Sequence, residues 1–239
     1  MKLSFADERV LAVMAHPDDA ELLCAGTLAR AKADGAAIGI VVMCRGDKGA
    51  GSAARTAENL GQVRHDEAKA AAADVLGAAL FWFNACDGEL FDTYENRRNL
   101  IEIYRTFRPT LVIAHAAEDY HPDHRAASAL AEAATWFAAS RGHVTASPAL
   151  DAPPKLWLAD TLNMTAFEPD FLVNVGDQLE MKKRMLACHR SQLERGSDGD
   201  FAPLQDLMLR QAAARGSQAG CAAAEAFRWH HAFKRVGAF

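Results

Sequence analysis

Four short apolar runs in the first half of the chain are each followed by a segment with helical spacing. The runs are RVLAVMA (residues 9–15), AIGIVVM (37–43), ALFWF (79–83) and TLVIAH (110–115). Nearly continuous apolar runs of this length are typical of parallel strands that are buried on both faces, and helices usually connect such strands. Right-handed crossovers then predict a Rossmann-like three-layer α/β/α sandwich with a mostly parallel sheet.

The second half of the chain continues this pattern less regularly. Helices are predicted after the four runs over residues 21–35, 52–77, 95–108 and 121–142. Beyond residue 142 the sequence predicts a Pro-rich connection, two short strands (156–162 and 171–175), a helix over 176–194, one further helix and a tail. We expect a single domain over residues 1–239, in which residues 1–142 form the Rossmann-like core and residues 143–239 complete it.

Composition excludes several classes of partner and compartment. The 239 residues carry a formal net charge of −5 without a cluster of basic residues, which argues against nucleic acid or an anionic membrane as the main partner. No apolar stretch reaches the roughly 18 residues of a membrane span, and the first ten residues lack the apolar region of a secretory signal. Five scattered cysteines favour a reduced, cytoplasmic protein over a disulfide scaffold.

Polar groups that are costly to bury follow two of the apolar runs. MAHPDDAE (residues 14–21) comes after the first run and EDYHPDH (118–124) after the fourth. Each contains two candidate metal ligands three residues apart, which brings their side chains to one side of a helix start. Imidazoles with one carboxylate suit Zn²⁺ with one open position, and Fe²⁺ or Mn²⁺ accept the same ligands.

Helix capping is the alternative explanation of these acids. Asp18 with Glu21 matches a capping box, and Asp119 or Asp123 is a candidate cap of the later helix. Either motif alone is explained by capping at least as well as by a metal. Two such motifs at the ends of two different strands favour a metal site.

The two motifs together resemble the signature pair of the PIG-L/LmbE-like family of zinc-dependent N-deacetylases. Four smaller matches follow in the same order as in that family: Arg45-Gly46, Asp87-Gly88, HRSQ (189–192) and AEAF (224–227). The resemblance therefore spans nearly the whole chain. It implies the LmbE-like form of the α/β/α sandwich and a family tendency to form homotrimers or hexamers.

Roles for individual residues are implied by this resemblance. By analogy with the family, His16, Asp19 and His124 are the metal ligands, and Asp18 is the general base that deprotonates the attacking water. His121 faces the reacting carbonyl, where a protonated ring would oppose the developing oxyanion. Pro17 restricts the turn between the ligands. The costly polar groups after the first strand would thus be held there by a cation.

Three residues are candidates for substrate contacts. Arg45 is expected to meet substrate hydroxyls or an anion, although it is equally explained as a solvated loop cation. Asp87 is a candidate for a sugar hydroxyl, but Asp-Gly is also a common turn. Tyr120 is a candidate for the pocket wall. The segments 47–56 and 194–205 are predicted rim or lid loops.

Two further histidines stand out, His115 at the end of the fourth strand and His189 in the predicted helix over 176–194. A role beside the metal ligands and a purely structural buried role explain His115 equally well. His189, within HRSQ, is expected to be structural.

The leading functional hypothesis is a metal-dependent hydrolase that removes an N-acetyl group from a small amino-sugar compound of the N-acetylglucosamine type. An amidase that acts on a larger thiol or sugar conjugate at the same site is a close alternative. A Rossmann-like ligand-binding module without catalysis is a third hypothesis, although the chain lacks the G-x-G-x-x-G fingerprint. A family member without activity is disfavoured because Asp18 and His121 are both present.

Overall fold

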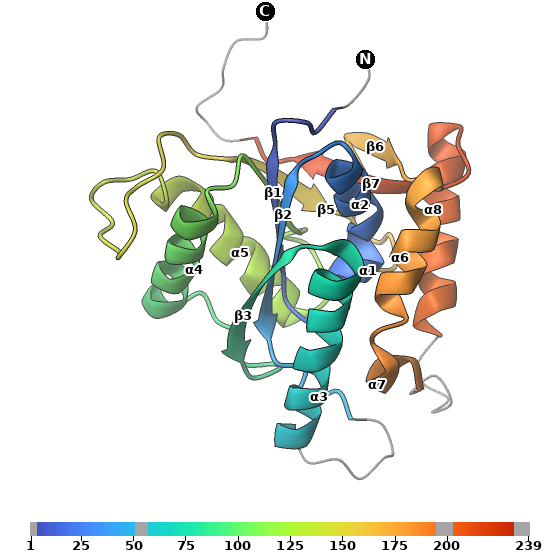
Figure 1. Ribbon diagram of the computed structural model, residues 1–239, viewed down its shortest axis with the longest axis horizontal. Helices are drawn as coiled ribbons and strands as arrows, with labels where there is room; N and C mark the ends of the chain where they lie inside the picture. The colour runs from blue at the N-terminus through green and yellow to red at the C-terminus, as the bar shows by residue number, and fades with distance from the viewer. Residues whose placement is uncertain (1–3, 51–56, 195–202, 232–239) are drawn as a thin grey trace, which may run out of the picture.

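A computed structural model of the chain describes residues 4–50, 57–194 and 203–231, and places seven strands in one sheet (Figure 1). The strand order is β3-β2-β1-β4-β5-β7-β6. The first five strands in this order are mutually parallel, whereas β7 pairs antiparallel with both β5 and β6. The strands are β1 (Arg9–Met14), β2 (Ala37–Cys44), β3 (Ala79–Ala85), β4 (Leu111–His115), β5 (Lys155–Ala159), β6 (Phe171–Asn174) and β7 (Ala224–Trp229).

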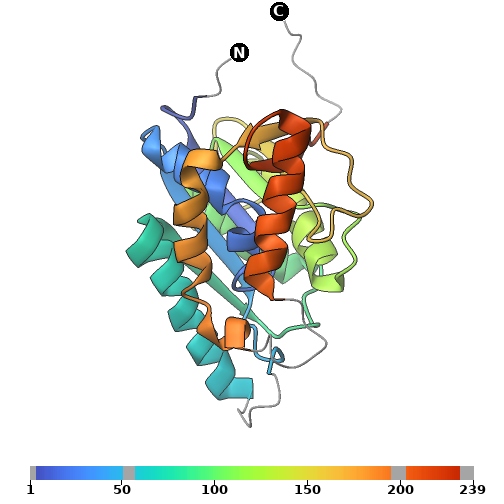
Figure 2. The ribbon, with the colours of Figure 1, turned by 90° about the vertical axis from the view of Figure 1, so that its right-hand side faces the viewer.

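Helices cover both faces of the sheet and complete the three layers. One face carries α1, α2, α3, α6 and α8, and Figure 2 views the sheet from that side; α4 and α5 cover the other face (Figure 1). The remaining helical pieces are a π-helical extension of α3, a 3₁₀ turn before α6, and the short α7. The bounds are α1 (Asp19–Leu23), α2 (Ala25–Ala33), α3 (Ala57–Lys69), its extension (Ala70–Leu76), α4 (Tyr94–Phe107), α5 (Pro122–Phe137), the 3₁₀ turn (Gly176–Gln178), α6 (Leu179–Leu186), α7 (Arg190–Leu193) and α8 (Leu204–Ala219).

The predicted fold class is confirmed, and each of the predicted strands is present within one to three residues of its expected ends. The sequence analysis missed β7, which it assigned to a tail. This strand carries Glu225 and Arg228 among its apolar residues, so its pattern is not that of a buried strand. Among the described residues, no helix is long and apolar enough to cross a membrane.

The predicted helix over 21–35 is broken at Cys24, where the backbone leaves the helical region. The break leaves the first amides of α2 without acceptors inside the helix. The carboxylate of Glu225 accepts hydrogen bonds from two of them, the amides of Gly26 (2.9 Å) and Thr27 (2.7 Å). The ammonium of Lys182 on α6 donates to the same carboxylate (2.5 Å) and to the carbonyl of Leu22 (3.0 Å). This buried ion pair therefore connects β7 and α6 to the start of α2.

A second predicted helix, over 121–142, ends early at Phe137. The buried guanidinium of Arg105 donates to the carbonyls of Ala138 (3.0 Å) and Ser140 (2.8 Å), and so satisfies acceptors just beyond the helix end. A cation at this position also interacts favourably with the helix dipole. The boundary is therefore set by a residue of α4 that is distant in sequence.

Replacing Glu225 with Ala is expected to lower the free energy of unfolding by about 3–5 kcal/mol, because it leaves the buried ammonium of Lys182 without its anion. Urea denaturation measures this change. The matched control is Glu180→Ala, which removes the mostly exposed partner of Lys183 and is expected to cost less than about 1 kcal/mol. Equal effects of the two substitutions would contradict the role assigned to the buried pair.

Candidate metal centre

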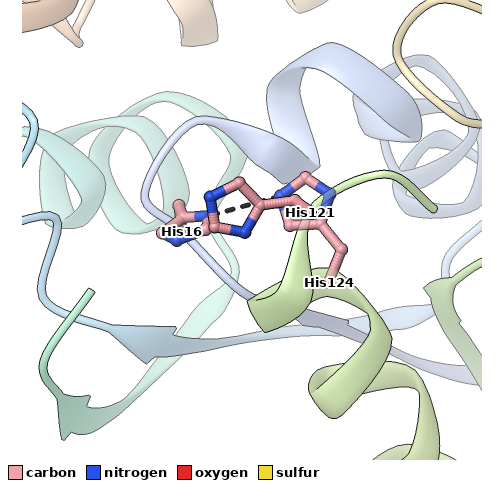
Figure 3. Close-up of side chains that lie close together, drawn as sticks. All are labelled: His16, His121 and His124. Atoms are coloured by element: carbon pink, nitrogen blue, oxygen red, sulfur yellow. Dashed lines mark hydrogen bonds between the residues drawn. The ribbon is translucent and has the colours of Figure 1, made fainter. Parts of the chain in front are cut away.

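Two turns meet at the carboxyl edge of the sheet, between β1 and β4. β1 ends at Met14 and leads into the turn that carries His16, while β4 ends at His115 and leads to His121 and His124 at the start of α5. The chain leaves β1 toward β2 on one side and β4 lies on the other, so this is the switch point at which parallel α/β sheets bind ligands. Figure 3 shows the imidazoles of both turns converging.

Three ligand atoms form a nearly equilateral triangle at this point. Nδ1 of His16 lies 3.2 Å from Nε2 of His124 and 3.4 Å from Oδ2 of Asp19. Nε2 of His124 lies 3.4 Å from the same carboxylate oxygen. A tetrahedral ion with bonds of about 2.1 Å separates its ligand atoms by about 3.4 Å, so the triangle has the dimensions of three corners of such a site.

Carboxylates face the outer nitrogens of both imidazoles. Nε2 of His16 lies 3.1 Å from Oδ2 of Asp123, and Nδ1 of His124 lies 3.1 Å from Oδ1 of Asp119. If a cation replaces the proton between the two rings, protons on these outer nitrogens would leave the lone pairs of the inner nitrogens directed at that cation. Burial alone would lower the pKa of His16, but the hydrogen bonds to Asp123 and Asp19 raise it to about 10. The surroundings of the triangle thus favour positive charge.

His115 contacts two of the three residues that form the triangle. It is completely buried, and its ring stacks on that of His124 with 4.0 Å between centroids. Its Nε2 lies 3.0 Å from the backbone nitrogen of Ala15 and 3.2 Å from Oδ2 of Asp19. Burial lowers the pKa of His115 to about 4, so its ring is neutral. Both roles left open for His115 therefore apply, since it is buried and also contacts the candidate ligands.

Asp18 is held in an unusual backbone conformation beside the triangle. Its φ of 105° lies in the left-handed region that side chains rarely adopt, and such strain tends to occur at functional sites. Its Oδ2 accepts a hydrogen bond from Nη2 of Arg64 (3.0 Å), which also donates to the carbonyl of Pro17. Burial raises the pKa of Asp18 to about 6, although Arg64 opposes the rise. Such a carboxylate is suited to accept a proton near neutral pH.

His121 presents a neutral ring to the same space. Its Nδ1 accepts a hydrogen bond from the amide of Asp123 (3.2 Å), so Nε2 carries the ring proton. Burial, and then the neighbouring His16 and His124, lower the pKa of His121 below its ordinary value. Both the hydrogen bond accepted by Nδ1 and the lowered pKa disfavour a second proton on this ring, so the structure favours an N–H donor at Nε2 over the expected protonated ring.

The capping alternatives hold only in part. Asp18 occupies the position before α1, but its side chain makes no capping hydrogen bond and contacts Arg64 instead. His121 caps α5, and Oδ1 of Asp119 accepts a hydrogen bond from the amide of His121 (2.9 Å) at the start of that helix. Asp123 accepts from the amides of Gly88 (2.6 Å) and Leu90 (3.2 Å) instead. Capping therefore does not explain Asp18 or Asp123.

Comparison with known proteins agrees with this geometry. The sequence profile of the PIG-L family, described as GlcNAc-PI de-N-acetylase, matches residues 11–135, more than half of the chain. The chain belongs to the PIG-L family. The matched segment contains both turns of the candidate centre, which confirms the resemblance inferred from the two motifs.

The proteins that are similar to this chain include deacetylases and a hydratase. Diacetylchitobiose deacetylase of Thermococcus kodakarensis is 26% identical over 189 residues, which cover 77% of this chain and 70% of the relative. The 4-oxalmesaconate hydratase of Pseudomonas putida is 28% identical over 165 residues, which cover 66% of this chain but only 60% of the hydratase. Among solved structures, N,N'-diacetylchitobiose deacetylase from Pyrococcus horikoshii, in complex with an inhibitor, superposes with a TM-score of 0.82 at 25% identity, covering 95% of this chain and 85% of that chain.

A cavity of about 380 Å³ opens onto the triangle of this PIG-L family member. Most of its lining residues are polar, and three are the apolar side chains Leu22, Leu162 and Leu204. The whole lining consists of His16, Asp18, Asp19, Leu22, Lys48, Gly49, Arg64, Asp87, Gly88, Tyr120, His121, His124, Leu162, Gln192 and Leu204. All five residues predicted for metal binding and catalysis are therefore brought together on one cavity.

The three residues predicted to contact substrate are divided between two cavities. Asp87 and Tyr120 line the cavity at the triangle, and Tyr120 is 60% exposed. The carboxylate of Asp87 accepts from the amide of Gly46 (2.7 Å), so it also fastens the neighbouring turn. Arg45 lines a second cavity instead, and its guanidinium donates to Asp47 (2.8 Å). Of the predicted rim loops, residues 51–56 and 195–202 lie outside the described residues.

Arg64 is the functional candidate that sequence reasoning missed. It lies on the face of α3 that also carries Leu60 and Ala68, and all three are buried. A buried arginine needs an anionic partner, so an arginine spaced four residues from apolar residues on each side could have indicated a buried carboxylate nearby.

His189 was expected to be structural. It is completely buried, 3.4 Å from the carboxylate of Glu21.

Proposed function

We propose that His16, Asp19 and His124 hold one divalent metal ion. Two imidazoles and one carboxylate fit Zn²⁺ best, and Fe²⁺ or Mn²⁺ accept the same donors. When bound, such an ion supplies a Lewis acid and lowers the pKa of water toward neutrality. The observation that carries this proposal is the triangle itself, whose sides of 3.2–3.4 Å match a tetrahedral site.

The neighbouring residues provide the proton transfers that amide hydrolysis needs. Asp18, with its pKa raised to about 6, takes a proton from the attacking water and returns it to the departing amine. Arg64 fixes the carboxylate in place through one oxygen and leaves the other for this work. The N–H of His121 donates a hydrogen bond to the carbonyl oxygen as negative charge develops on it.

We infer that the reaction is removal of an N-acetyl group from a small amino-sugar compound of the N-acetylglucosamine type. Membership of the PIG-L family and the names of two deacetylase relatives support this substrate class. Asp87 and Tyr120 lie on the cavity where a sugar would sit. Oligomerisation into trimers or hexamers stays a prediction.

Hydration is the competing reaction, because the hydratase from Pseudomonas putida is also similar to this chain. Oxalmesaconate, as its name says, is a carboxylate anion, and a site that binds it needs cationic groups that are not already paired with protein carboxylates. Apart from the proposed metal ion and the imidazoles around it, the cations in the described lining are already paired. Lys48 lies 2.5 Å from the carboxylate of Glu89, and Arg64 lies 3.0 Å from that of Asp18. This part of the lining suits a neutral amino sugar better than a carboxylate anion.

The test is an assay of the zinc-loaded protein with N-acetylglucosamine, N,N'-diacetylchitobiose and an N-acetylglucosaminyl conjugate of inositol. Equal amounts of acetate and free amine are expected. 4-Oxalmesaconate is the comparison substrate, followed by its ultraviolet absorbance. Hydration of that compound without acetate release from any of the three sugars would contradict the proposed deacetylase.

Asp123→Asn is expected to weaken zinc binding about 10- to 100-fold, because an amide cannot accept the Nε2 proton of His16 as strongly as a carboxylate does. Competition with a chromogenic chelator measures this affinity. Asp177→Asn, at an exposed position in the 3₁₀ turn before α6, is the matched control and should bind zinc like the unmodified protein. Unchanged affinity in Asp123→Asn would show that the outer carboxylate does not support the ligand.

A further inference from the structure

A second cavity, of about 520 Å³, lies next to the one at the triangle. The turn at residues 45–48 contributes to both: Arg45 lines the second cavity, and Lys48 lines the first. The lining of the second cavity consists of Arg45, Asn59, Gly61, Gln62, His65, Trp82 and Asn84. Its volume lies within the range of about 300–1,000 Å³ that is typical of small-molecule sites.

One face of α3 and two residues of β3 form the walls. Asn59, Gln62 and His65 recur every three residues along α3 and therefore share a face. Trp82 and Asn84 on β3 line the other side, and Asn84 stands where the pairing of β3 with β2 shifts register and its own φ is +69°. The imidazole of His65 meets the indole of Trp82 edge-on, with 4.8 Å between centroids, so the two walls contact each other.

The charges on these walls are already balanced. The guanidinium of Arg45 lies 2.8 Å from the carboxylate of Asp47, and Nδ1 of His65 lies 3.2 Å from that of Asp66. The same carboxylate of Asp66 accepts from the side-chain amide of Gln62 (3.1 Å), which orients that amide. A cavity balanced in this way does not select an anion such as phosphate.

The remaining chemistry is that of amide groups around one large aromatic ring. Gln62 and Asn84 each carry an amide with both a donor and an acceptor, which suits vicinal hydroxyl groups. The half-buried indole of Trp82 provides the large apolar surface in this lining, and the C–H face of a sugar ring packs against such a surface. No aliphatic side chain is among the described lining residues, which disfavours an apolar ligand.

We propose that this cavity is a second binding site, separate from the metal centre, for a neutral pyranose ring. The ring lies against Trp82 and forms hydrogen bonds with the side-chain amides of Gln62 and Asn84. The proposal rests on the lining of this cavity alone and does not depend on the deacetylase activity.

Nuclear magnetic resonance of the ¹⁵N-labelled protein tests this site without any turnover. The indole N–H signal of Trp82 is assigned by its loss in Trp82→Phe, and it is followed during titration with methyl pyranosides of glucose, galactose, mannose and N-acetylglucosamine. At least one of them is expected to shift this signal saturably. Inorganic phosphate at the same concentrations is expected to leave it unmoved.

Gln62→Ala should raise the dissociation constant of that sugar about fivefold, the effect of losing one hydrogen bond. Gln205→Ala replaces an equally exposed helical glutamine outside the cavity and should change nothing. No shift of the Trp82 signal with any of the four sugars would overturn the proposal, as would an equal response to phosphate. An unchanged dissociation constant in Gln62→Ala would overturn it as well.

Discussion

Asp18→Asn is expected to retain stoichiometric zinc and to lose about 10²- to 10⁴-fold in kcat, the usual contribution of a positioned general base. The carboxylate lies beside the triangle without being one of its three corners, so the ion stays bound. An asparagine keeps the shape and can still contact Arg64 through its oxygen, but it cannot take a proton. Acetate release and zinc content, measured on the same preparation, check both parts.

Asp170→Asn is a suitable control for this experiment, because Asp170 is exposed and its carboxylate accepts from the amide of Trp229 (2.8 Å), at the far strands of the sheet. It should retain the kcat of the unmodified protein. Full activity in Asp18→Asn would remove Asp18 from the mechanism. Loss of zinc in that variant would instead make Asp18 a ligand.

Asp19→Ala is expected to abolish stoichiometric zinc binding and to reduce acetate release to background. A single oxygen, Oδ2 of Asp19, forms two sides of the triangle, at 3.4 Å from the inner nitrogen of His16 and 3.4 Å from that of His124. Its removal leaves two imidazoles, which hold the ion far more weakly than three donors do. Zinc content after gel filtration and the rate of acetate release measure the two effects.

Excess zinc in the assay separates weakened binding from a lost catalytic group. If Asp19 acts as a ligand, millimolar zinc should restore part of the activity of Asp19→Ala but none of that of Asp18→Asn. An Asp19→Ala protein that keeps one zinc per chain through gel filtration would remove Asp19 from the ligand set.

Much of the fold was predictable because β1, β2 and β4 are almost completely buried. The runs that became β1, β2, β3 and β4 are mostly apolar, and their period and length identify them as strands. β7 escaped prediction because Glu225 faces the start of α2 and Arg228 pairs with Glu118, so both charges serve distant partners. The break at Cys24 has the same origin, since the carboxylate that receives the freed amides lies about 200 residues further along the chain.

The candidate centre was predictable because its residues cluster in two short motifs. His16 and Asp19 share one turn, and His121 and His124 share another, so spacing and position after a strand were sufficient to mark these four as candidate ligands. Which three of them bind a metal, and the role of Asp18, were implied only by the family resemblance. Residues that act from elsewhere were not visible in this way. Arg64 reaches Asp18 from α3, and the position of Arg45 in a second cavity depends on how the turn at 45–48 packs against α3.

Anomalous diffraction at the zinc absorption edge, from crystals grown with Zn²⁺, tests the central claim most directly. The account predicts one strong peak within about 2.0–2.2 Å of Nδ1 of His16, Oδ2 of Asp19 and Nε2 of His124. A peak among His16, Cys44 and Asp123, whose ligand atoms also lie within 4.8 Å of one another, would contradict it. So would the absence of any peak at the carboxyl edge of β1 and β4.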